Sequence, residues 1–148
     1  MILTPEHFQA ALITLIVVVF SVLLHFEAIL LISQMLKKLR LTRRPRFILM
    51  IMGLLMAHVL EIWVFGAAGW WMVRMGDMGQ LVGYTDLEFL DYIYLSAASF
   101  TTVGFGDLAP QGMIRMLFGT ESLTGFLLIT WSASFTYIEM ERHWKSLD

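Results

Sequence analysis

Three apolar stretches, each long enough to cross a lipid bilayer as a helix, constrain the fold of this chain more than any other feature. They run from about Phe8 to Ile32, from about Phe47 to Val73 and from about Met113 to Ile138. A helix needs about 20 residues to span a bilayer. The composition agrees, because 58% of the residues are hydrophobic and only 15% are charged, and a soluble domain of this length could not bury so much apolar surface. The sequence therefore predicts an all-α membrane protein with three membrane-spanning helices.

A shorter apolar segment, from Glu88 to Thr101, precedes the third stretch and is too short to cross a bilayer. It fits a re-entrant helix, which is tolerated at membrane depth where protein surrounds it. The pattern Thr-Asp-Leu-Glu matches a capping box, with Thr85 as the N-cap and Glu88 at the third helical position. This predicts a helix that begins close to Asp86. The loop before it is expected to be flexible, because it carries three glycines: Gly76, Gly79 and Gly83.

A dense basic cluster separates the first two stretches: Lys37, Lys38, Arg40, Arg43, Arg44 and Arg46. Segments rich in Lys and Arg stay on the cytoplasmic side of a membrane. The first stretch has no Lys or Arg before it and no small-residue cleavage site after it, which predicts a retained helix rather than a cleaved signal. We therefore expect an outer N-terminus, an outer loop after the second helix and a cytoplasmic C-terminus.

The same cluster bears on partners. Anionic lipid headgroups are an expected partner of the segment Lys37–Arg46, because basic segments next to a membrane attract them. Nucleic acid is not expected, since the cluster lies between two membrane spans and mainly sets their orientation.

The segment Thr101-Thr102-Val103-Gly104-Phe105-Gly106-Asp107 follows the re-entrant segment. A pore that passes a dehydrated cation must replace the hydration shell with oxygens, and a ring of backbone carbonyls does this. Gly104 and Gly106 can take backbone angles that other residues avoid, which lets successive carbonyls point the same way. The Thr102 hydroxyl can add a further oxygen. The segment resembles the TVGYG-type filter of the potassium channel superfamily, with Phe105 where tyrosine is more usual.

The resemblance implies a division of the chain and an assembly. Residues 47–138 correspond to a pore domain of outer helix, pore loop and inner helix, residues 1–36 to an additional helix, 37–46 to a cytoplasmic loop and 139–148 to a short cytoplasmic tail. Four pore loops are needed to surround an ion, so a homotetramer is expected. The implied K+ ligands are Thr102, Val103, Gly104 and Phe105, with Gly106 completing the filter and Thr101 and Asp107 supporting it. No cofactor besides the permeant ion is implied.

Two further positions follow from the resemblance. Gly125 falls where many members of the superfamily carry a hinge glycine in the inner helix, and close packing of helices through a small residue explains it equally well. Ala98 stands where some bacterial channels have a glutamate that hydrogen-bonds the aspartate after the filter. Asp107 is therefore expected to need another partner.

Glu121 lies inside the third stretch, where an unpaired carboxylate is costly. It could favour cations in the cavity of the pore. We expect instead that it hydrogen-bonds Ser96 or Ser99 and braces the pore helix, because buried carboxylates are usually satisfied locally.

A second polar set lies in the first two stretches: His25, Glu27, His58 and Glu61. Counting about 1.5 Å per residue from the cytoplasmic ends places the four at similar depths, so the pairs His25 with Glu61 and Glu27 with His58 are both possible. A histidine beside a carboxylate can act as a pH sensor, and both residue types bind zinc. The favoured interpretation is that the set docks the additional helix onto the pore domain.

These observations predict a potassium-selective channel that conducts K+ passively. A non-selective cation channel of the same fold and a pore gated by a separate regulatory subunit are the alternatives. Enzyme activity is not expected, because the chain has no cysteine, no His-Glu-x-x-His pattern and no aspartate in the spans. No span carries the regular arginine series of a voltage sensor, and residues 139–148 are too few for a sensory domain. The small size favours a prokaryotic plasma membrane.

Overall fold

The computed structural model describes residues 5–39, 41–76, 78–104 and 106–144, with side chains through residue 142. The described chain is mostly helical, and two short strands interrupt it. In chain order the elements are α1 (Pro5–Lys38), α2 (Arg43–Arg74), β1 (Gln80–Val82), α3 (Phe89–Phe100), β2 (Ala109–Gln111) and α4 (Ile114–Trp144).

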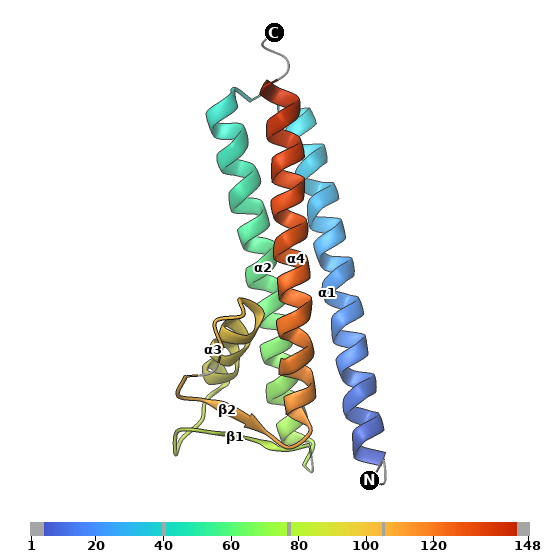
Figure 1. Ribbon diagram of the computed structural model, residues 1–148, viewed down its shortest axis with the longest axis vertical. Coiled ribbons are helices and arrows are strands. Elements are labelled where there is room, and N and C mark those ends of the chain that lie inside the picture. The colour runs from blue at the N-terminus through green and yellow to red at the C-terminus, as the bar shows by residue number, and fades with distance from the viewer. Residues whose placement is uncertain (1–4, 40, 77, 105, 145–148) are drawn as a thin grey trace.

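The three long helices α1, α2 and α4 lie side by side along the long axis of the molecule (Figure 1). The short helix α3 and the two strands gather at the end that also holds the start of α1. The connection between α1 and α2 and the end of α4 lie at the opposite end. This arrangement places the basic segment and the C-terminal end together, away from the loop that follows α3.

Among the described helices, α1 and α2 are long and apolar enough to cross a membrane. Many of their large apolar side chains are exposed, as Leu15, Phe20 and Ile51 illustrate. A core helix of a soluble protein would bury such residues, whereas a helix in lipid exposes them. The third expected span, from about Met113 to Ile138, overlaps α4. This helix is less apolar than α1 and α2, so a third membrane span stays a prediction.

One face of α1 docks the helix onto α2 and α4. Its buried residues recur every three or four positions, which is the spacing of one helical face: Ala10, Thr14, Val17, Ser21, His25, Ile29, Ile32 and Leu36. Apolar members at the two ends of this face belong to two hydrophobic clusters, one around Phe65 and Phe118 and one around Met50 and Leu54. Between the clusters lies the polar residue His25.

The loop after α2 is held by strand pairing rather than left flexible. β1 pairs antiparallel with β2, with Leu81 opposite Pro110. Gly79 and Gly83 have positive φ angles and approach other backbone closely, since an added Cβ would lie 2.1 Å from Gln111 O and 2.2 Å from Asp107 O respectively. The glycines thus permit tight packing, and the short strand pair is a feature that the sequence did not predict.

The start of α3 also differs from the expected one. The N-cap is Glu88, not Thr85, because Glu88 has an extended backbone (φ −99°, ψ 171°) and the helix begins at Phe89. Asp91 completes a capping box, and its carboxylate accepts a hydrogen bond of 2.7 Å from the Glu88 N–H. The capping box is thus formed by Glu88 and Asp91, three residues later than the expected pair of Thr85 and Glu88.

Candidate functional site

The loop after α3 turns its backbone N–H groups toward the end of that helix. Three N–H groups donate hydrogen bonds of 3.0–3.1 Å to carbonyl oxygens in the last turn of α3: Thr101 to Ala97, Thr102 to Ser99 and Gly104 to Ala98. The Thr101 hydroxyl also donates to Ala97 O, at 2.7 Å. These hydrogen bonds hold the first residues of the loop against the end of α3.

Two residues of the loop have backbone angles that side chains usually avoid. Thr102 has φ 58° and Gly104 has φ 94°, with Val103 between them. A residue other than glycine in this region costs about 1–2 kcal/mol, so Thr102 is held there by its surroundings. Gly106 and Gly104 face open space. Phe105, the remaining residue of the expected filter, lies outside the described residues.

Asp107 has two tyrosine partners, Tyr84 in the loop before α3 and Tyr94 on α3. The Tyr84 hydroxyl donates a hydrogen bond to Asp107 Oδ2. This hydrogen bond lowers the pKa of Asp107, and the carboxylate in turn raises the pKa of Tyr84. Tyr84 therefore supplies a hydrogen bond to Asp107 that a glutamate at position 98 could have supplied. This bond favours an ionised Asp107 beside the loop.

Glu121 braces α3 from behind. Its side chain is fully buried, and Ser96 donates a hydrogen bond to Glu121 Oε1. Ser96 also lies 2.7 Å from Ile62 O, so this serine connects α3 to both α2 and α4. Ser99 instead donates to Leu95 O within its own helix, at 2.8 Å. Of the two serines considered in the sequence, Ser96 is the one that binds Glu121.

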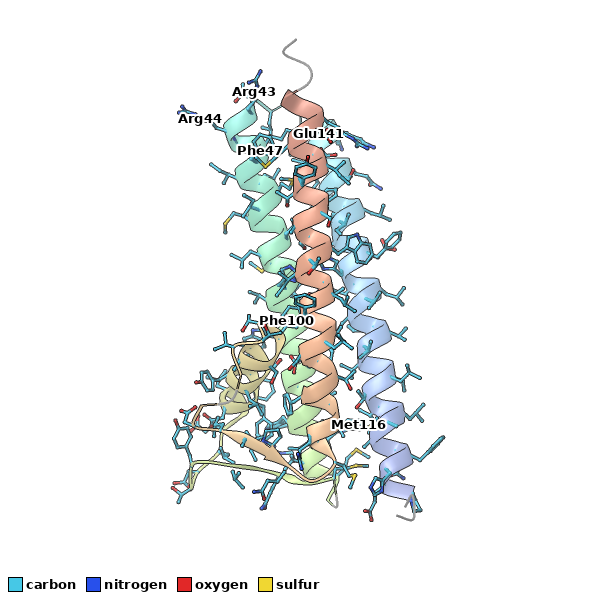
Figure 2. All side chains as sticks on the ribbon, in the orientation of Figure 1. Arg43, Arg44, Phe47, Phe100, Met116 and Glu141 are labelled. Carbon is cyan, nitrogen blue, oxygen red and sulfur yellow. The ribbon has the colours of Figure 1, made fainter. Side chains whose placement is uncertain are left out.

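Gly125 lies where the end of α3 presses on α4. A Cβ added there would be 2.2 Å from Phe100 O and 2.8 Å from the Phe100 ring. Figure 2 shows Phe100 beside the middle of α4. The absence of a side chain at Gly125 therefore has a packing reason, namely the close approach of the α3 backbone.

Two histidines and a carboxylate meet at the centre of the three long helices. His25 Nδ1 on α1 lies 2.9 Å from Glu61 Oε1, and His58 Nδ1 on α2 lies 2.9 Å from Glu61 Oε2. On the other side of the rings, Ser132 Oγ on α4 lies 3.3 Å from His25 Nε2 and 3.1 Å from His58 Nε2. The two rings stack with centroids 5.2 Å apart. We call these four residues the His-Glu-Ser ring.

Glu27 does not join this ring. It is exposed on α1 and lines a groove between α1 and α2 with a volume of about 530 Å³. The possible pair of Glu27 with His58 is therefore not formed, and Glu61 bonds both histidines. Ser132 was missed in the sequence, because serine is common in helices of this kind and only the tertiary packing brings it to the histidines.

A second cross-link lies at the opposite end of the bundle from α3. Arg46 on α2 donates hydrogen bonds to Leu36 O on α1, at 2.7 Å, and to Glu139 Oε2 on α4, at 3.1 Å. Arg46 is thus engaged within the protein, whereas Arg43 and Arg44 extend outward beside it (Figure 2). Arg40, another member of the basic cluster, lies outside the part of the chain that the structure describes.

The comparisons with known proteins single out one family. A family model described as an ion channel matches residues 46–142, which begin in the first turn of α2 and end in the last turn of α4. The match therefore covers α2, the loop around α3 and α4, and it excludes α1. Neither the curated proteins nor the solved structures contain a match to the chain.

Proposed function

Because the chain belongs to the ion channel family, we propose that it is a potassium-selective channel that conducts K+ passively through the carbonyl groups of residues 102–105. The observation that carries this proposal is the backbone of the loop after α3. Its N–H groups at Thr101, Thr102 and Gly104 are turned toward the helix end, and its carbonyl groups would replace the water around a cation.

The alternating backbone of the loop supports the same proposal. Thr102 and Gly104 both have positive φ, with Val103 between them, and this alternation lets neighbouring carbonyl groups point in one direction. The hydroxyl group of Thr102 would add an oxygen at the inner end. Asp107, held by Tyr84, would add negative charge near the outer end, where it attracts cations.

A homotetramer would complete the pore. Val103 is 82% exposed in the single chain, and nothing lies within 4 Å of a Cβ added at Gly104 or Gly106. The face of α4 that turns away from α1 and α2 is exposed as well, as Leu123 and Phe126 show. Three further copies around a common axis would cover these surfaces and bring four loops together.

In this assembly α4 would be the inner helix and the third membrane span. Its lower apolarity fits a helix that is shielded from lipid on several sides and borders a water-filled cavity. The positions of the basic residues favour a cytoplasmic side at the turn between α1 and α2. The N-terminus and the loop after α3 would then face outward. A plasma membrane, prokaryotic in origin, is the location that we propose.

Potassium flux into liposomes that contain the purified protein tests this function. Gly104→Ala should abolish K+-selective flux, because alanine is strained at φ 94°. Gly76→Ala is the matched control, since Gly76 also has a positive φ and open space around it but lies at the end of α2. Normal potassium selectivity in Gly104→Ala would contradict the assignment of the filter. Equal loss of flux in Gly104→Ala and Gly76→Ala would show that backbone strain at any such glycine stops the flux, whether or not the glycine lies in the filter.

A further inference from the structure

The His-Glu-Ser ring is a closed cycle of four polar contacts. It runs from Glu61 to His25, to Ser132, to His58 and back to Glu61, over distances of 2.9, 3.3, 3.1 and 2.9 Å. The side chains of His25 and Glu61 are fully buried and that of His58 is 15% exposed. Buried polar atoms need hydrogen-bond partners, and a buried net charge is costly. The number of protons in the ring is therefore constrained.

Four contacts need four hydrogens. The Ser132 hydroxyl supplies one, and each neutral imidazole supplies one. With an ionised Glu61 and two neutral histidines, only three hydrogens are present and the ring carries a net charge of −1. One additional proton supplies the fourth hydrogen and makes the ring electrically neutral, whether it sits on an imidazole or on the carboxylate.

We propose that the His-Glu-Ser ring is a binding site for one proton, shared by His25, His58 and Glu61. A second additional proton would give a net charge of +1 and would leave the Ser132 hydroxyl hydrogen without a place in the ring. The neutral ring is thus the state in which every contact is made and no charge is buried.

Other titratable groups do not face the ring from the elements packed against it, as far as the described residues show. On α1, Glu27 is exposed on another face. The end of α3 contributes Phe100, and α4 contributes Ser132 and Trp131. Glu121 lies eleven positions from Ser132 on α4, about 16 Å along the helix axis, and is bonded to Ser96.

A metal ion fits the ring less well than a proton. The ligand atoms of His25, His58 and Glu61 lie within 4.8 Å of one another, but the imidazole planes are only 24° from parallel. The nitrogen lone pairs lie in these planes and so do not converge on a point about 2.0 Å from each nitrogen, as zinc requires. Each Nδ1 already pairs with one oxygen of Glu61.

The ring adjoins the end of the pore helix, which links the proton to the proposed function. The His58 ring lies 5.6 Å from the ring of Phe100, the last residue of α3. Phe100 in turn packs on Gly125 of α4. Loss of the proton removes one contact among α1, α2 and α4 directly behind the filter. We expect K+ flux to fall as the ring loses its proton, and this expectation rests on the proposed channel function.

Nitrogen-15 NMR of histidine in the purified full chain counts the ring protons directly. Over roughly pH 5 to 8, we expect the nitrogen signals of His25 and His58 to change together, as one shared proton requires. Ser132→Ala should lose the additional proton at a lower pH than the wild type, because the contacts of Ser132 to the two histidines are gone while the neutral charge balance still favours that proton. Ser134→Ala is the matched control, since Ser134 is exposed and bonds Thr130 O in its own helix.

Several results would overturn the proton site. They are release of the proton at the same pH in the wild type and Ser132→Ala, two neutral rings beside an ionised Glu61 throughout the titration, or displacement of both Nδ1 protons by micromolar Zn²⁺. The wild-type titration decides the question even if Ser132→Ala does not fold.

Potassium flux from liposomes, measured over the same pH range, tests the link to conduction. The pH dependence of flux should move to lower pH in Ser132→Ala, together with the proton release, and should stay unchanged in Ser134→Ala. Flux that stays constant with pH while the ring loses its proton would overturn the link between the ring and conduction. If neither the wild type nor a variant shows flux at any pH, the proposed function fails, and the NMR count still decides the proton site.

Discussion

At the scale of single residues, Asp107 shows how one hydrogen bond can replace another. α3 carries Ala98 where a longer polar residue could have reached Asp107, and Asp107 is bonded instead by Tyr84 of the loop before α3 and by Tyr94 of α3. β1 and β2 hold this loop against the segment that follows Asp107. The partner of the aspartate thus depends on the strand pair as much as on the pore helix.

Replacing Tyr84 with phenylalanine should raise the pKa of Asp107 toward its ordinary value of 3.8, because the largest cause of its lowering is removed. A lowered pKa means that the contact stabilises the fold above the ordinary pKa and that this contribution is lost as the pH falls through the lowered value. Carbon NMR of the aspartate carboxyl groups measures the change. Tyr137→Phe, at an exposed position on α4, should leave the pKa of Asp107 unchanged; no change in Tyr84→Phe would contradict the account.

At the scale of the elements, α4 is positioned by three contacts along its length. Glu121 and Ser96 join it to α3, Ser132 joins it to the two histidines, and Glu139 joins it to Arg46. In lipid, where the hydrophobic driving force between helices is lost, polar contacts and close packing hold helices together. The spacing of these contacts explains why α1, α2 and α4 form one bundle.

Gly125→Ala should destabilise the protein by about 1–3 kcal/mol, the usual cost of overpacking, because the new methyl group would meet backbone at Phe100. Gly119→Ala on the same helix is the matched control, since nothing lies within 4 Å of its added Cβ, and it should stabilise the helix by about 0.5–1 kcal/mol. Thermal unfolding in detergent compares them. A Gly125→Ala variant as stable as Gly119→Ala, with altered flux, would favour the hinge interpretation over packing.

Arg46→Gln should lower the stability of the bundle by about 3 kcal/mol, because it leaves the Glu139 carboxylate, which is 8% exposed, without its main cation. It also removes the bond to Leu36 O. Arg142→Gln is the control, since Arg142 pairs with the same carboxylate but is 68% exposed, and such pairs contribute about 0–1 kcal/mol. Equal unfolding temperatures for the two variants would show that Arg46 does not tie the helices together.

At the scale of the whole molecule, much of the helical architecture could be predicted from the sequence. The long apolar stretches of α1 and α2 and the short segment of α3 are local signals that need no tertiary information. The strand pair could not be predicted, because each strand has three residues and its partner lies beyond α3. Ser132 and Tyr84 were missed for the same reason, since their roles arise only where distant segments meet.

The most direct test of the central claim is the reversal potential of current through the purified protein in a planar bilayer, with K+ on one side and Na+ on the other. A selective filter predicts a shift of about 59 mV for each tenfold preference for K+, so a shift well above that value is expected. A reversal potential near zero would indicate a non-selective cation pore. The absence of any current would contradict the proposal that this chain conducts K+.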